Sequence, residues 1–210
     1  MAERPAWKLT NYVKRELFSF DWNGGFAVSQ KKKNINNLHS AIRRKYNEPV
    51  LEISTKSDVE LGQKLSAFHL KINDYYLENI FQSSKVYENG GPYLDLLTVQ
   101  PTDAKKDPRH KTSGKLTGFF YHDELWELEP KTAFYDYLYI SAAKEMLKQE
   151  ELEALCEYEW FTDIEFNPNK SINCQARAVA LLKYVIKNDC WNVLENKATW
   201  LEFHRKLVRG

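Results

Sequence analysis

The chain has 210 residues, of which 43% are hydrophobic and 28% charged, and its formal net charge is +1. This is the composition of a globular protein with a sizeable core, and it excludes a membrane protein because no run of about 18 apolar residues occurs. The N-terminus lacks the apolar segment of a secretory signal, and the cysteines (Cys156, Cys174 and Cys190) are too widely spaced for a disulfide scaffold or a zinc site, so we expect a cytoplasmic protein that does not contact membranes.

Hydrophobic spacing predicts helices and short strands along the whole chain. Apolar residues recur every three or four positions in the helical segments, as Ile35, Leu38 and Ile42 do, and they alternate in the strands. In chain order we predict a strand over Leu17–Trp22, a helix over Lys31–Tyr46, a strand over Pro49–Ile53, a helix over Tyr76–Tyr87, a hairpin over Lys115–Leu128 that turns at His122-Asp123, one or two helices within Ala133–Tyr158, a helix over Ile172–Lys187 with Ser171 as its N-cap, and a helix over Lys197–Val208.

The order of these elements indicates the fold class. Helices outnumber strands, and the strands do not alternate regularly with the helices as they do in a wound parallel sheet. No internal repeat, low-complexity tract or linker interrupts the chain. We therefore predict an α+β fold that is mostly helical with a small sheet, in a single domain over residues 1–210.

Positive charge is concentrated in two stretches. No acidic residue occurs between Trp22 and Asn47, and this stretch contains six basic residues that we take as candidates for binding DNA: Lys31, Lys32, Lys33, Arg43, Arg44 and Lys45. A second basic stretch runs from Lys105 to Lys115, with Asp107 as its acid. Such stretches indicate a polyanionic ligand, or else they are helix faces that are simply solvated.

The standard catalytic signatures are absent, and the five histidines are not spaced like metal ligands, so we expect neither a metal nor a cofactor. Cys174 stands at the predicted start of a buried helix, where a helix N-terminus would lower its pKa. A small buried core residue is the interpretation that we favour for it.

The predicted helix over Tyr76–Tyr87 combines groups that can catalyse a reaction. At about 100° per residue, Glu78, Gln82 and Lys85 fall within one narrow arc beside an apolar stripe. Close to a core, a carboxylate is pushed toward its protonated form and a lysine toward its neutral amine, which are the forms of a general acid and of a nucleophile. The alternative is an exposed polar stripe without a role.

These same residues resemble a known family. Leu65-Ser-Ala-Phe68, followed by Glu78-x-x-Phe-Gln-x-x-Lys85, resembles the NADAR or YbiA-like superfamily, whose usual forms are Leu-Ser-Asn-Phe and Glu-His-x-Phe-Gln-Ala-x-Lys. Ala67 and Asn79 depart from that pattern. Other runs are similar to the branch found beside DarT-type toxins that ADP-ribosylate DNA: Gly25–Gln30, Leu51–Ser57, Gly90–Asp95 and Phe161–Arg177.

The resemblance implies a NADAR-like fold and an N-glycosidase for substrates of the ADP-ribose type. In the toxin-associated branch the implied substrate is ADP-ribosyl-guanine in single-stranded DNA, and the implied role is that of antitoxin to a DarT-type ADP-ribosyltransferase. Removing ADP-ribose would restore the base. Glu78 and Lys85 would be catalytic, and covalent participation of a lysine is likewise implied by the resemblance.

Further side chains are candidates for binding ADP-ribose. Lys56 is also a second candidate for the reacting amine, or else a surface lysine at the end of a strand. Hydroxyl groups, charge and polar side chains suit the pyrophosphate, and an aromatic ring suits the base, although such rings and caps are often purely structural. The candidates are Lys56, Ser57, Ser66, Phe68, Gln82, Lys105, Arg109, Asn167, Asn173 and Arg177.

Two other functions stay open at the level of the sequence. One is an N-glycosidase that acts on a free nucleotide or on an N-riboside of the riboflavin pathway. The other is a module that binds ADP-ribose or nucleic acid without catalysis, for which basic patches and aromatic rings would suffice. An acid and an amine on one arc distinguish the enzyme from the binding module, because binding alone does not require them.

Overall fold

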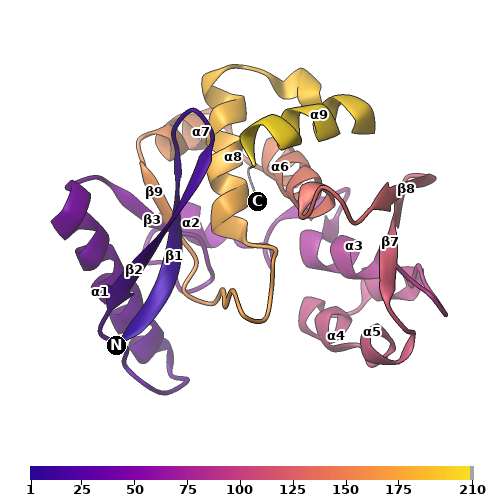
Figure 1. Ribbon diagram of the computed structural model, residues 1–210, viewed down its shortest axis with the longest axis horizontal. Coiled ribbons are helices and arrows are strands. Elements are labelled where there is room, and N and C mark those ends of the chain that lie inside the picture. The colour runs from indigo at the N-terminus through magenta and orange to yellow at the C-terminus, as the bar shows by residue number, and fades with distance from the viewer. Residues whose placement is uncertain (209–210) are drawn as a thin grey trace. The chain divides into compact units, whose positions relative to one another are not determined.

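The computed structural model describes residues 1–208, and its contacts divide the chain into two compact units (Figure 1). Unit 1 contains Met1–Ser66 and the chain from Leu147 onward, and unit 2 contains Ala67–Met146. Helices and small sheets occur in both units, which confirms the predicted α+β class. The single domain over 1–210 stays a prediction. None of the helices described here is long and apolar enough to cross a membrane.

Unit 1 is built on a four-stranded sheet in the order β2-β1-β9-β3. Its elements are β1 (Ala2–Leu9), β2 (Val13–Phe20), α1 (Val28–Tyr46), β3 (Val50–Glu52), α2 (Glu60–Lys64), α7 (Gln149–Cys156), β9 (Trp160–Thr162), α8 (Gln175–Lys187), the 3-10 turn η2 (Trp191–Leu194) and α9 (Lys197–Leu207). β1 is antiparallel to both β2 and β9, and β3 is parallel to β9. The parallel pair joins two segments that lie far apart in sequence.

The apolar core of unit 1 lies between the sheet and α1. Phe18 and Trp160 from the sheet pack edge to face at 5.4 Å, and Leu38 and Ile42 of α1 are fully buried against the same cluster. Neighbouring residues of a strand point to opposite faces, so Phe161 points away from α1, to the face that α8 covers. These contacts explain why α1 and α8 could be predicted from their apolar spacing.

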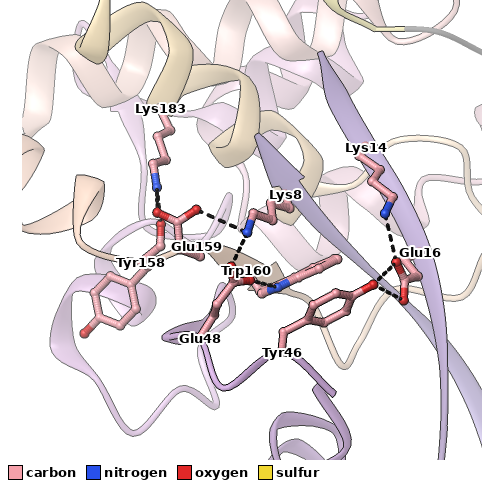
Figure 2. Close-up of polar contacts among 9 residues, drawn as sticks. All are labelled: Lys8, Lys14, Glu16, Tyr46, Glu48, Tyr158, Glu159, Trp160 and Lys183. Carbon is pink, nitrogen blue, oxygen red and sulfur yellow. Dashed lines mark hydrogen bonds and ion pairs between the residues drawn. The ribbon is translucent and has the colours of Figure 1, made fainter. Parts of the chain in front are cut away.

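Polar side chains also join the elements of unit 1 (Figure 2). Lys183 is 1% exposed, and its Nζ donates to the backbone oxygen of Tyr158 at 2.6 Å and to Glu159 Oε1 at 2.9 Å. Lys8 reaches Glu159 at 3.6 Å and Glu48 at 2.5 Å, so α8 is tied through β9 to β1. A polar pocket of about 460 Å³ adjoins these side chains, lined by Leu9, Thr10, Asn11, Glu159, Lys183, Tyr184, Lys187 and Asn188.

β1 was not predicted, and β2 begins earlier than expected. Pro5 lacks an N–H group and therefore argues against a strand in the interior of a sheet. In the structure, β9 pairs with Ala6, Trp7 and Lys8. Pro5 therefore lies beyond the end of the β9 ladder, where no hydrogen bond from its nitrogen to β9 is required. β2 covers Val13–Phe20 rather than Leu17–Trp22, because pairing with β1 extends it at its start.

Unit 2 surrounds the short helix α3, which contacts β5, η1, α4 and α6. Its elements are β4 (Lys71–Ile72), β5 (Tyr75–Tyr76), α3 (Leu77–Ser83), β6 (Lys85–Tyr87), the 3-10 turn η1 (Leu94–Thr98), α4 (Pro101–Lys106), α5 (Arg109–Thr112), β7 (Leu116–Tyr121), β8 (Glu124–Glu127) and α6 (Ala133–Met146). The hairpin of β7 and β8 turns at His122 and Asp123, both with positive φ, as predicted. β6 pairs with β7 to complete a three-stranded sheet.

The predicted helix over Tyr76–Tyr87 is too long. The hydroxyl groups of Ser83 and Ser84 both donate to the backbone oxygen of Ile80, at 3.0 and 2.7 Å, and compete with the helical ladder. The backbone oxygen of Ser84 then accepts from Phe120 N at 2.7 Å, which draws the following residues into the sheet. Lys85 therefore begins a strand instead of extending the helix.

The start of α8 also differs from the prediction, whereas the helices within Ala133–Tyr158 agree with it. α8 begins at Gln175 with Cys174 as its N-cap, whereas Ser171 lies in the preceding turn, where its N–H donates to the backbone oxygen of Asn167 at 3.0 Å. Ala133–Tyr158 forms two helices, α6 and α7, separated by two residues.

Candidate active site

The acid, the amide and the amine of the sequence motif are linked by hydrogen bonds in unit 2. Gln82 Nε2 donates to Glu78 Oε1 at 2.8 Å, and Lys85 Nζ donates to Gln82 Oε1 at 2.6 Å. Glu78 and Gln82 are one helical turn apart on α3, which brings their side chains together. Lys85 reaches back from the start of β6, so the cluster forms although the predicted helix is shorter.

Lys85 lies in an environment that disfavours its charged form. Its Nζ is 5.1 Å from the centroid of the Phe81 ring, and Phe81 is buried. Burial lowers the pKa of Lys85 to about 8, with Glu78 opposing the shift and the Lys105 cation adding to it. With this pKa, about a tenth of Lys85 is a free amine at pH 7, which is the form that a nucleophile requires.

Phe68 and Lys105 stand beside the linked trio. Lys105 Nζ lies 5.3 Å from the centroid of the Phe68 ring and 3.8 Å from Glu78 Oε1. Glu78 is 5% exposed, whereas 55% of the Lys105 side chain is exposed. The arrangement offers a buried carboxylate and, toward solvent, an ammonium group that can meet a phosphate.

Arg109 is engaged with acids of unit 2. Its guanidinium pairs with Asp95 at 2.6 Å and with Asp107 at 2.9 Å, and lies 4.3 Å from the centroid of the Tyr93 ring. The hydrogen bonds that Arg109 donates to Asp107 and Asp95 raise its pKa. A phosphate would have to compete with two carboxylates, so Arg109 is a weaker candidate than Lys105.

The other candidate residues for ADP-ribose belong to unit 1. Ser57 and Ser66 are each 1% exposed, and the Ser57 hydroxyl accepts from Val59 N at 3.2 Å. Lys56 is partly exposed, and its Nζ donates to Thr55 Oγ1 at 2.9 Å. The Ser57 hydroxyl therefore stabilises the loop after β3, Ser66 is buried after the end of α2, and Lys56 stays partly accessible.

The remaining three lie in the segment before α8 and in the first turn of that helix. Asn167 Oδ1 accepts from Asn169 N at 3.0 Å, and Arg177 donates through Nη1 to the backbone oxygen of Ile172 at 3.0 Å. Asn173 differs, because its Oδ1 is buried and accepts no hydrogen bond from the residues described. Asn167 and Arg177 thus hold their own segment in place. Their expected role in binding ADP-ribose stays a prediction.

Sequence reasoning missed a buried acidic cluster in unit 1. Glu52, 2% exposed, accepts hydrogen bonds from Thr162 Oγ1 at 2.6 Å, from Ile164 N at 2.8 Å and from Ser54 Oγ at 2.8 Å. Burial raises the pKa of Glu52 and also that of the buried Asp163, which Glu52 raises further. The signal in the sequence was an acid within an otherwise apolar strand, Val50-Leu-Glu-Ile53.

Cys174 is the buried core residue that the sequence favoured. It is 1% exposed, and burial, followed by the negative charge of Asp163, raises the pKa of its thiol well above the ordinary value. Burial thus outweighs the helix N-terminus. Across residues 1–208, no group of three or more His, Cys, Asp or Glu side chains is arranged to hold a metal ion.

Half of the predicted DNA-binding charges are neutralised by acids. The ion pairs are Lys31 with Glu165 at 3.3 Å, Lys32 with Asp58 at 2.5 Å and Lys45 with Glu16 at 2.6 Å. Lys33, Arg43 and Arg44 are exposed and form no ion pair within the described part of the chain. Of the six charges, these three are the ones left to attract a polyanion.

The comparison with protein families agrees with the motif at this site. A family model described as a DarT1-associated NADAR antitoxin matches residues 2–209, nearly the whole chain. No match was found among curated proteins. The family match confirms the resemblance that the Glu78–Lys85 motif indicated, and it extends through the segments of both units. This chain belongs to the family of DarT1-associated NADAR antitoxins.

Proposed function

We propose that this protein is an N-glycosidase that removes ADP-ribose from guanine bases of single-stranded DNA and thereby reverses the action of a DarT1 toxin. The linked trio of Glu78, Gln82 and Lys85 is the observation that carries the proposal. A protein that only binds its toxin or ADP-ribose does not need a partly desolvated amine that is linked to a carboxylate through the side chain of Gln82. Membership of the DarT1-associated family supports the choice of substrate.

The bond that breaks joins C1 of the ribose to a guanine nitrogen. In direct hydrolysis, C1 gains positive character, the guanine nitrogen takes a proton, and water supplies the hydroxyl group that C1 receives. We assign to Glu78 the role of delivering or accepting that proton. Lys105 is exposed, and its Nζ lies 3.8 Å from Glu78 Oε1. It would face the pyrophosphate of the ADP-ribose group whose bond to guanine is cleaved.

A second route uses the amine of Lys85. Opening of the ribose ring converts C1 and the guanine nitrogen into an imine, which the neutral Nζ of Lys85 attacks at C1. The guanine amine then leaves with a proton, and C1 stays bound to Nζ as a new imine. Water hydrolyses this imine, regenerates the amine and releases ADP-ribose. The lowered pKa of Lys85 favours this route, because only the free amine attacks.

The test is incubation of the protein with a single-stranded oligonucleotide that carries one ADP-ribosylated guanine. We expect loss of the modification and release of free ADP-ribose, measured by chromatography and mass spectrometry. An unmodified oligonucleotide and the Glu78→Gln variant are the controls. Binding of the modified strand without turnover would support the binding module instead, and turnover of free ADP-ribosyl nucleosides alone would support a metabolic glycosidase.

A further inference from the structure

The loop between β2 and α1 of unit 1 (Figure 1) contains two aromatic residues, Trp22 and Phe26. Phe26 is 97% exposed, and it follows Gly24 and Gly25. Gly25 has a φ of 114°, a region that favours glycine, so the turn places the ring of Phe26 away from the core. Trp22, at the start of the loop, is partly exposed and packs against the core through Phe20 at 6.1 Å.

Side chains of α1 hold this loop in place. The buried Asn34 accepts through Oδ1 from Asn23 N at 2.6 Å and donates through Nδ2 to the backbone oxygen of Asn23 at 3.0 Å. Asn37 donates to the backbone oxygen of Asp21 at 2.7 Å, and Gln30 accepts from Ala27 N at 3.1 Å. These hydrogen bonds anchor the loop at both ends, yet the ring of Phe26 is left in solvent. Because the exposed ring contributes no packing energy to the fold, we infer that the ordered loop presents it to a ligand.

Cations accompany these rings. The guanidinium of Arg4 lies 4.9 Å from the centroid of the Trp22 ring, and Lys31 Nζ lies 6.0 Å from it. Arg4 forms no ion pair within residues 1–208, and its buried Nε has no hydrogen-bond partner there. Lys33 is exposed on the first turns of α1 and is likewise without an acidic partner in that part of the chain.

The acids nearby are Glu3, Asp21 and Glu165. Glu165 pairs with Lys31 at 3.3 Å, and Glu3 accepts from Ser19 Oγ at 3.2 Å. The charges close to the loop are therefore mixed rather than strongly basic. A ligand held here needs flat apolar faces for the rings together with a few negative charges for the cations beside Trp22. Single-stranded nucleic acid combines these two features, since its bases are free to stack.

We propose that Phe26 and Trp22, with Arg4 and Lys31 close to the Trp22 ring, form a platform on which unpaired bases of the DNA strand stack. This inference rests on the proposed function for the identity of its ligand. Neither ring belongs to the linked trio of Glu78, Gln82 and Lys85, so the platform raises affinity for DNA without taking part in the cleavage. Stacking on a π-face is tolerant of sequence, which suits a repair enzyme whose target guanine occurs in varied surroundings.

The experiment measures fluorescence anisotropy of a labelled, unmodified oligo-dT with wild-type protein, Phe26→Ala and Phe26→Tyr. We expect Phe26→Ala to weaken binding by about fivefold to a hundredfold, the value of one stacked base, and Phe26→Tyr to retain it. Phe120→Ala is the matched control, because Phe120 is 39% exposed but lies on β7. Phe26 packs against nothing, so its removal leaves the thermal unfolding midpoint unchanged.

The outcomes separate this proposal from the proposed function. Equal affinity of wild type and Phe26→Ala for oligo-dT overturns the platform, whatever the enzyme does. A change of oligomeric state in Phe26→Ala by sedimentation, without a change in DNA affinity, assigns the ring to a protein contact and also overturns it. If both variants bind oligo-dT as expected but wild type releases no ADP-ribose from modified DNA, the proposed hydrolase fails and the platform stands. Intact turnover of an ADP-ribosylated single nucleotide by Phe26→Ala supports a role in strand binding alone.

Discussion

Lys85 is joined to Glu78 through the amide of Gln82, which accepts from the lysine at 2.6 Å and donates to the carboxylate at 2.8 Å. The amide thereby has a fixed orientation, with its oxygen toward the amine and its nitrogen toward the acid. It also keeps the two charged groups from neutralising each other in a direct ion pair. Acid and amine can then act on different atoms of one substrate, the leaving base and C1 of the ribose.

Glu78→Gln should lower the rate of ADP-ribose release by at least about a hundredfold, which is the usual contribution of a positioned acid or base. Glutamine preserves the shape of the buried side chain but carries no titrating proton. The affinity for ADP-ribose, measured by calorimetry, should change little. Full activity in a folded Glu78→Gln protein would remove α3 from the active site.

Lys85→Ala should lower the rate by a similar factor, because it removes the amine that attacks C1. Reduction with borohydride during turnover should trap ADP-ribose on Lys85 in the wild-type protein, and mass spectrometry of the digested protein locates the adduct. Lys115→Ala is the matched control, since Lys115 is an exposed lysine of the same unit. Wild-type rates in Lys85→Ala would contradict the amine role and make Lys56 the next residue to test.

The rate should depend on pH through Lys85. Because burial lowers the pKa of Lys85 to about 8, kcat should rise by about tenfold per pH unit below that value and level off above it. The unfolded chain binds this proton up to the ordinary pKa of 10.5, so Lys85 adds to stability as the pH rises from about 8 toward 10.5. Stopped assays of kcat across this range check the profile, and a rate independent of pH would argue for direct hydrolysis.

Reversal of Lys33, Arg43 and Arg44 to glutamate should weaken binding of ADP-ribosylated DNA more than binding of free ADP-ribose. These three cations have no acidic partner within residues 1–208, so they are free to release counterions from phosphates. The slope of log affinity against log salt should become shallower in the triple variant. Equal losses for both ligands, or none, would show that this face of α1 is merely solvated.

Lys183→Met should lower the free energy of unfolding by about 1–3 kcal/mol, since the backbone oxygen of Tyr158 would lose the buried Lys183 ammonium that donates to it at 2.6 Å. Lys187→Met is the matched control one turn later on α8, where the side chain is exposed and the expected change stays within about 0.5 kcal/mol. Urea unfolding followed by circular dichroism measures both. Similar stability of the two variants would mean that water replaces the lysine at Tyr158.

The spacing of residues in the sequence determined several helices, one hairpin and the motif that indicates the family. The helices α1, α8 and α9 follow from apolar residues three or four apart, and the hairpin of β7 and β8 follows from its turn at His122 and Asp123. The link between Glu78 and Gln82 was also local, because residues four apart in a helix are neighbours. The motif over Glu78–Lys85 indicates the family by its residue types and spacing alone.

Contacts between segments that are distant in sequence decided where α3 ends and which basic residues are paired. Lys85 lies outside the helix because Ser83 and Ser84 end α3 and because the following residues pair with β7. The spacing of apolar residues describes neither effect. Glu165, Asp58 and Glu16, distant in sequence from the basic run, neutralise half of it. Periodicity reports which face of an element is apolar, whereas the tertiary structure determines which charges meet and which groups lose their water.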